Sequence, residues 1–145
     1  MIKIKVDVDM GKLVAATPAI KAQTLQATKD CGQSLVATAS GAAPHLEGIL
    51  DSSGKEKTTA SGAGASTTVS FHAVSRRGFN YAQWTHNSVY NLGARSRAKG
   101  GGVGMSGAHY AVGPKYLTRP LQGEAPYYMK YINEKLQNVL KSLGG

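Results

Sequence analysis

Cysteine, long apolar runs and bulky aromatic residues are all scarce in this chain. Cys31 is the single cysteine, which excludes an internal disulfide framework and a zinc site built from several cysteines. No apolar run approaches the roughly 20 residues that a membrane-spanning helix needs. The first residues alternate lysine with β-branched residues, which is unlike a signal peptide. We therefore expect a protein that assembles in the cytosol and makes no membrane contact.

The scarcity of bulky residues predicts a thin core. Two phenylalanines and one tryptophan stand among 145 residues, so alanine and glycine supply much of the apolar content. A chain of this length can bury roughly 68–70% of its extended-chain surface, enough for one core. We expect a single domain over residues 1–145 that has one sheet covered by one or two helices and gains stability from neighbouring molecules.

Acidic residues are absent between residues 57 and 123, and the whole chain carries a net charge of +9. All eight acids lie outside this acid-free segment. Within it the cations are Lys57, Arg76, Arg77, Arg95, Arg97, Lys99, Lys115 and Arg119. Such an asymmetry indicates a positive face directed at nucleic acid or at an acidic protein surface. The simpler alternative is a solvated basic surface that aids solubility.

Apolar periodicity places strands between two long helices. Apolar residues at every second position predict strands, and apolar residues three or four positions apart predict helices. The predicted strands are residues 2–8, 67–74 and 109–112. The predicted helices are residues 18–40 and 124–143. Thr17 is the expected N-cap of the first helix. Cys31 falls on the apolar stripe of this helix, which predicts a buried thiol and not a nucleophile. This order predicts an α+β fold, with one antiparallel β-sheet packed by a long N-terminal helix and a C-terminal helix.

The segments between these elements give further predictions. Residues 79–86 contain the only tryptophan, and their alternation predicts a strand that fills the core or meets another subunit. The Gly/Ser-rich segment 54–66 is expected to be a hairpin arm or a flexible loop. The Gly/Arg-rich segment 94–107 is expected to be an extended loop, because none of its residues can anchor a core. Residues 113–121 are expected to form a rigid turn or a linker.

The residue pattern does not indicate an enzyme. Residues 102–107 match G-x-G-x-x-G, but no apolar strand precedes them and no predicted helix follows. The four histidines lack paired ligand spacing, paired carboxylates are missing, and no G-x-S-x-G motif supports a nucleophile. We predict no catalytic activity, no cofactor and no metal. The 94–107 segment instead allows two binding modes: it neutralises phosphates without reading sequence, or it becomes ordered against a neighbouring subunit.

The order of the motifs resembles a known family. The motifs are Asp30 in the first helix, Pro44…Gly48-x-Leu50-x-Ser52, Asn80-Tyr81-Ala82-x-Trp84-x-His86, and Tyr116-Leu117-Thr118-Arg119-Pro120-Leu121 before the last helix. Together they cover most of the chain, which resembles the minor capsid or tail-completion family of tailed bacteriophages, small neck proteins that join head to tail. The chain departs from the family in its 94–107 insertion and where the family often has Pro-Phe-Leu.

This resemblance implies a structural virion protein, assembled in the host cytoplasm. It implies a homo-oligomeric ring, sixfold by analogy, between head-completion (stopper) and tail-terminator proteins, with double-stranded DNA passing non-specifically through its lumen. The expected subunit and partner interface residues are Tyr81, Trp84, His86, Arg95, Arg97, Lys99, Tyr116 and Arg119. The expected DNA-facing residues are Arg76, Arg77 and Lys57.

Two alternatives belong to other classes. The first is a basic nucleic-acid-binding accessory protein that acts through its Arg/Gly-rich loop. The second is a toxin-like nuclease, which no motif supports. Within the neck reading, we expect Arg95, Arg97 and Lys99 to dock on acidic neighbours, since tight phosphate contacts would retard DNA in transit.

Overall fold

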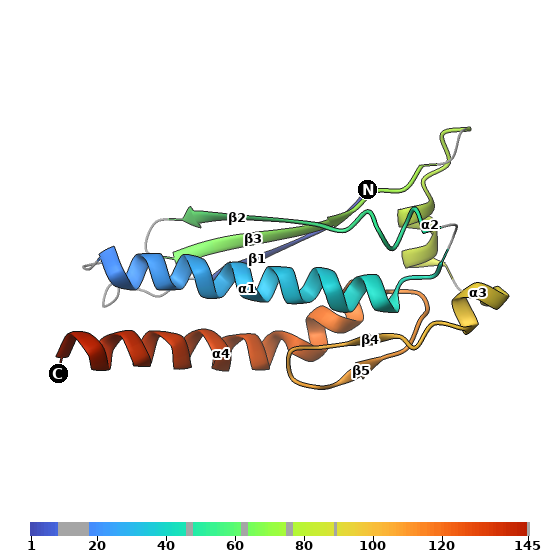
Figure 1. Cartoon of the computed structure of the whole chain (residues 1–145). Coiled ribbons are helices and arrows are strands. Elements are labelled where there is room, and N and C mark those ends of the chain that lie inside the picture. Colours follow the sequence, from blue (N-terminus) through green and yellow to red (C-terminus); the bar gives the residue numbers. More distant parts are fainter. Residues whose placement is uncertain (9–17, 46–47, 62–63, 75–76, 89, 145) are drawn as a thin grey trace.

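The computed structural model describes residues 1–8, 18–45, 48–61, 64–74, 77–88 and 90–144. The described elements, in chain order, are β1 (Ile2–Val8), α1 (Pro18–Ala42), β2 (Lys55–Ser61), β3 (Gly64–Phe71), α2 (Tyr81–Asn87), α3 (Ala94–Arg97), β4 (Gly102–Val103), β5 (His109–Tyr110) and α4 (Thr118–Gly144). A three-stranded antiparallel sheet packs against α1, and α1 packs against α4 (Figure 1). The predicted α+β class is confirmed, with β4 and β5 adding a small second sheet.

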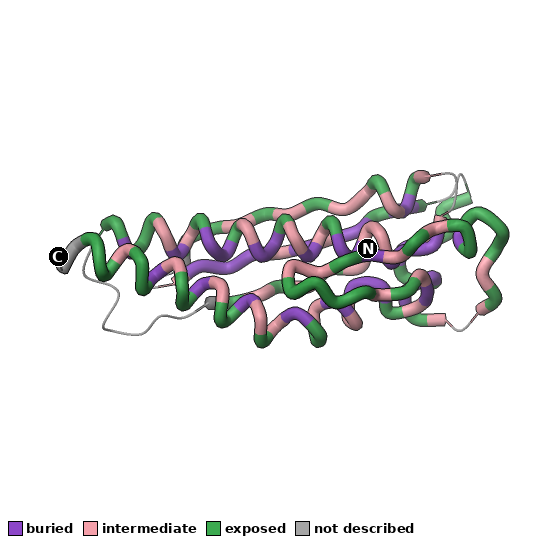
Figure 2. The backbone as a smooth tube through the Cα atoms, turned by 60° about the horizontal axis from the view of Figure 1, so that its bottom comes forward, coloured by how far each residue is buried: buried purple, intermediate pink, exposed green. Residues whose placement is uncertain are grey.

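The central strand of the main sheet is β3, with β1 and β2 antiparallel on either side. Alternation turns Ile4, Val69 and Phe71 toward α1, where buried segments gather (Figure 2). Gly32 of α1 permits this close packing, because a Cβ atom there would overlap the hydroxyl of Thr67 in β3. The predicted strand over 2–8 is therefore confirmed, and the predicted strand over 67–74 corresponds to β3.

The segment 54–66 forms β2 and the start of β3, so the hairpin alternative was right and the flexible loop was wrong. Its low hydrophobicity has a structural cause: β2 is polar on both faces. On the inner face Thr58 donates a hydrogen bond to the hydroxyl of Thr67 at 2.9 Å, and on the outer face stand exposed lysines. A strand stabilised by hydroxyl pairs gives no apolar alternation for sequence analysis to detect.

Helix α1 extends two residues beyond the predicted Ser40. The predicted Thr17 cap lies outside the described residues, while Pro18 is the first helical residue, where its missing N–H has no partner to lose. Cys31 is 2% exposed, and burial, with the nearby Asp30 carboxylate, raises the pKa of its thiol to about 12. The predicted buried thiol is thus confirmed.

Residues 79–86 do not form the predicted strand. They contain most of α2, because Asn80 caps the helix by accepting a hydrogen bond from the Gln83 N–H at 3.1 Å. The helix then buries Ala82, Thr85 and His86, which share one face at helical spacing. The alternation in the sequence therefore did not reflect a strand. The Asn80 cap favours a helix at this position.

The Gly/Arg-rich segment 94–107 is also more ordered than predicted, since it forms α3, β4 and a turn that leads to β5. Its glycines allow backbone to lie directly on α1. A Cβ atom at Gly102 would overlap the carbonyl oxygen of Thr38, and one at Gly41 would lie 2.6 Å from the Gly102 Cα. Thr38 also donates a hydrogen bond to the Val103 carbonyl at 3.0 Å. The prediction of an extended loop was wrong, because this segment is held by contact between its backbone and α1 and does not need large apolar side chains.

Glu124 fixes the β4–β5 hairpin to α4. Its fully buried carboxylate accepts hydrogen bonds from the backbone N–H and hydroxyl of Ser106 and from the Tyr110 hydroxyl at 2.9 Å. Burial by itself would raise the pKa of Glu124, but the hydrogen bonds from Ser106 and Tyr110 outweigh it and hold the pKa below its ordinary value.

Helix α4 begins at Thr118, six residues before the predicted Glu124, so residues 118–121 at the end of the predicted rigid turn are helical. Pro120 stands in the first turn, where backbone N–H groups have no helical partner. Pro126 lies inside the helix and removes one helical hydrogen bond. Packing offsets that loss, because Leu117 before the helix and Tyr128 within it are buried in the core.

We predict that Gly102→Ala destabilises the protein by about 1–3 kcal/mol or more, the usual cost of overpacking, because the new methyl group would meet the rigid carbonyl of Thr38. Denaturant unfolding measures the loss. Gly100→Ala is the matched control in the same run, since a Cβ atom there meets nothing within 4 Å. Equal stability of the two variants would show that β4 does not depend on this contact.

Candidate functional site

Four aromatic residues form a surface cluster around α2, which we call the aromatic cluster: Phe79, Tyr81, Trp84 and Tyr90. The ring centroids of Trp84 and Tyr90 stack 5.1 Å apart with an interplanar angle of 23°. Phe79 packs edge-on to Tyr81 at 5.1 Å and lies 6.2 Å from Trp84. Phe79 is 46% and Trp84 44% exposed. Large aromatic side chains that remain this exposed while packing on one another are typical of protein contact surfaces.

Two hydrogen bonds attach the cluster to the rest of the fold. The Tyr81 N–H donates to the Ala73 carbonyl at 2.9 Å, and the Tyr90 hydroxyl donates to the Thr85 carbonyl at 2.6 Å. Burial raises the pKa of the Tyr90 hydroxyl to about 12, so it remains a neutral donor. A hollow of about 150 Å³ adjoins the cluster, between Trp84, Tyr90 and Pro44. The predicted interface residues Tyr81 and Trp84 therefore lie together on a preformed surface.

Two other predicted interface residues lie inside the chain. Tyr116 has no exposed surface and His86 is 4% exposed, so neither side chain offers surface to a partner in this conformation. Their rings meet edge-on at 5.1 Å, and the Tyr116 hydroxyl donates to the Ala82 carbonyl at 2.7 Å. They connect α2 to the start of α4.

The His86 imidazole accepts from the backbone N–H of Thr118 through Nε2 at 3.4 Å, so it supports the first turn of α4. Burial lowers the pKa of His86, and the positive charges of Lys115 and Arg119 add to that effect. The ring is therefore neutral at physiological pH and acts as an acceptor. This role in the fold gave no recognisable sequence signal, since a lone histidine has no diagnostic spacing.

Lys99 also has an internal role. Its ammonium group donates to the carbonyls of Ser40 and Ala43 at 2.9 and 2.6 Å and to Asp51 Oδ2 at 3.2 Å. It thus caps the C-terminus of α1, where a cation is favoured by the helix dipole. His45 also bonds the same Asp51 oxygen through Nδ1 at 3.1 Å. Although burial by itself would raise it, the bonds from His45 and Lys99 hold the pKa of Asp51 below its ordinary value.

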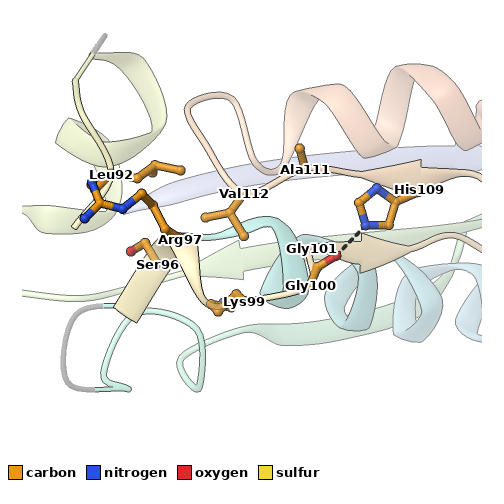
Figure 3. Close-up of a pocket in the computed structure, with 9 residues that line it drawn as sticks. All are labelled: Leu92, Ser96, Arg97, Lys99, Gly100, Gly101, His109, Ala111 and Val112. Carbon is orange, nitrogen blue, oxygen red and sulfur yellow. Dashed lines mark hydrogen bonds between the residues drawn. The ribbon is translucent and has the colours of Figure 1, made fainter. Parts of the chain in front are cut away.

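Arg119 likewise contacts its own chain, since its guanidinium donates to the carbonyls of Pro114 and Ala111 at 2.9 and 2.7 Å. Arg95 and Arg97 are the exposed cations of α3. Arg97 reaches the Leu92 carbonyl at 3.0 Å and lines a hollow of about 400 Å³ (Figure 3). His109 stands across that hollow and bonds the Gly100 carbonyl (Figure 3). Its described lining residues include cations but no carboxylate, so we assign no reaction to it.

The predicted DNA-facing residues fall in different places. Arg76 lies outside the described residues, and Arg77 lies in the turn that precedes α2. Lys57 stands on the outer face of the main sheet, beside Lys3, Lys5 and Lys55. Sequence analysis missed these three lysines, although the alternation of β1 already placed Lys3 and Lys5 on one face.

Neither a metal-ligand cluster nor a membrane span is found in the described part of the chain. No group of three or more His, Cys, Asp or Glu side chains there could hold a metal ion. No helix among the described residues has the length and apolar character needed to cross a bilayer. No protein-family model matches this chain, and comparisons with curated proteins and with solved structures found no match either.

We predict that Lys99→Met lowers the free energy of unfolding by about 2 kcal/mol at neutral pH, since hydrogen bonds to charged groups contribute about 1.5–3 kcal/mol. The effect should depend on pH. The folded pKa of Asp51 lies below its ordinary value of 3.8, so its stabilising contribution is complete above that pH and declines as the pH falls further. The difference between the two melting temperatures should therefore shrink in acid without vanishing, because the bonds from Lys99 to the carbonyls of Ser40 and Ala43 do not involve Asp51.

Arg95→Met is the control for that measurement, because it removes one cation from the same segment at an exposed position. It should leave the melting temperature nearly unchanged. If Lys99→Met were equally harmless, the cap on α1 would contribute nothing to stability.

Proposed function

We propose that this chain is a structural protein of the tailed-phage neck, forming a ring that joins the head connector to the tail around the DNA channel. The order of motifs described above supports the family assignment. The single structural observation that carries the proposal is the aromatic cluster, which exposes Phe79 and Trp84. The cluster surrounds α2, which lies at one end of the elongated molecule (Figure 1). Exposed aromatic patches of this kind are typical of surfaces that bind other protein molecules.

A ring requires heterologous contacts, in which one face of a subunit meets a different face of the next. The aromatic cluster supplies one such face. The outer side of α4 is a suitable second face, because Met129 is 73% and Leu140 46% exposed there. Met129 adapts its shape to an aromatic neighbour at little cost. In this proposal the ring consists of six copies and lies between the stopper and tail-terminator proteins.

The alternative, nucleic-acid binding through the Arg/Gly-rich segment, has weaker support. Lys99 is engaged with α1 and Asp51, and the Gly102 backbone lies against α1. Arg95 and Arg97 remain exposed, and these two suit an acidic neighbour in the neck. The segment thus has fewer free cations and less freedom to wrap a strand than its composition suggested.

The proposal predicts that Phe79→Ser combined with Trp84→Ala abolishes head–tail joining while leaving the fold intact, because both side chains are about half exposed. In the phage genome that carries the gene, the double variant should yield filled heads and free tails, which negative-stain electron microscopy distinguishes from joined particles. Val103→Ser is the control, since Val103 is 62% exposed on β4. Normal joined particles from the double variant, or from a nonsense mutant of the gene, would overturn the proposal.

Docking of α3 on an acidic neighbour gives a separate prediction. Arg95→Glu with Arg97→Glu should also separate heads from tails, because like charges would then face each other across the contact. Lys99 must be left unchanged, since its replacement would disturb the end of α1. Joined particles that fail only in DNA ejection would instead place these arginines at the DNA channel.

A further inference from the structure

The outer face of the main sheet carries an ordered array of lysines and hydroxyls, which we call the lysine face. Across the strands, Lys3 of β1 is level with Ser70 of β3 and Lys55 of β2. In the next row of the same face, Lys5 is level with Thr68 and Lys57. All four lysines are exposed, while Thr68 and Ser70 are half-buried between them.

Strand geometry fixes the spacing of this array. Same-face neighbours along a strand lie about 6.6–6.8 Å apart, and the two outer strands lie about 10 Å apart. The four ammonium groups therefore flank a central strip of hydroxyls. Together they line a hollow of about 540 Å³ over the sheet, on the side opposite α1 (Figure 1). Within the described residues no helix covers this side of the sheet.

Among the residues that the structure describes, the charges of the lysine face are mostly unpaired. Lys5 and Asp7 approach to 3.6 Å at one end, with both side chains more than 60% exposed, which makes the pair a weak one. Within the described residues Lys3, Lys55 and Lys57 form no ion pair. Glu56 also lines the hollow, and its carboxylate accepts a hydrogen bond from Thr58, whose side chain stands on the α1 side of β2. Like charges held this close repel one another and favour a ligand that carries several negative charges.

The other side chains of the face narrow the chemistry of that ligand. None of its described lining residues is aromatic, so bases have no surface on which to stack, as single-strand binding requires. Arginine, asparagine and glutamine, which read base edges, are missing from the same set. Apart from Met1 and Glu56, the lining consists of lysine and hydroxyl side chains, which contact phosphates. We infer that the lysine face binds duplex DNA through its phosphate backbone, without reading the sequence.

The expected affinity of one subunit is low. Four phosphate contacts correspond to a slope of about −3.6 in log affinity against log salt, and non-specific dissociation constants lie around 10⁻⁴–10⁻⁶ M at physiological salt. Weak contacts allow a duplex to slide, and a ring would present the face several times, which raises the total avidity. The choice of duplex DNA rests in part on the proposed neck function, but binding is measured on the purified chain, so the two can fail separately.

The test is fluorescence anisotropy of a short labelled random-sequence duplex titrated with the purified full chain over a range of salt. The test variant replaces all four face lysines with glutamine: Lys3, Lys5, Lys55 and Lys57. The matched control replaces four exposed lysines of α1 and α4 with glutamine: Lys21, Lys29, Lys130 and Lys141. Both variants lose the same net charge, and circular dichroism verifies that both remain folded.

We expect the face variant to bind at least about tenfold more weakly at low salt and to lose most of the salt slope. The control should retain a slope close to that of the wild type, and a version with four arginines on the face should restore binding. Equal loss in both glutamine variants would mean that net charge alone attracts DNA and would overturn the assignment. Preference for single-stranded DNA, or binding to poly-glutamate with no binding to duplex, would overturn it as well.

Discussion

Close backbone packing around α1 is the constraint on which the rest of the structure depends. The sheet approaches this helix at Gly32 and β4 approaches it at Gly41, while α4 packs along another side. With few bulky residues available, the chain builds its core from small residues and threonines whose hydroxyls bond within the helix, such as Thr24 and Thr28. Stability therefore depends on how closely the sheet, β4 and α4 fit against α1, since small side chains each bury little apolar area.

Acids at the two flanks hold the acid-free segment in place. Asp51 precedes the segment and binds Lys99, and Glu124 follows it and binds the Ser106–Tyr110 hairpin. Both carboxylates are depressed in pKa by these bonds. The charge asymmetry of the sequence therefore has a structural cause in part, because cations such as Lys99 and Arg119 stabilise the fold.

The sequence was sufficient to predict the elements whose side chains alternate or repeat clearly. The apolar period of β1 and the stripe through Cys31 gave the first strand and α1, and their order gave the α+β class. Sequence-based prediction failed for elements that are not stabilised by a regular pattern of apolar side chains. The Asn80 cap decided α2, hydroxyl pairs such as Thr58–Thr67 stabilised β2, and backbone contact at Gly102 ordered a segment that composition assigned to a loop.

Only some of the aromatic residues that were predicted to lie at an interface are on the surface. Trp84 and Tyr81 lie together on the surface, whereas Tyr116 and His86, equally aromatic in sequence, fill the space between α2 and α4. Composition cannot distinguish these cases, because an aromatic side chain is suited both to a core and to an interface. The lysines of the sheet were overlooked for the opposite reason: β2 had to be recognised as a strand before Lys55 and Lys57 could be placed beside Lys3 and Lys5.

In the strand order β1-β3-β2, no other strand of the described residues pairs with the outer edge of β1 or of β2. Such edges invite pairing with strands of other molecules, and natural proteins discourage this with lysines. Here each edge strand carries two lysines whose charges would be brought together if a second copy extended the sheet. Growth of this protein into continuous intermolecular sheets is thus opposed by electrostatic repulsion.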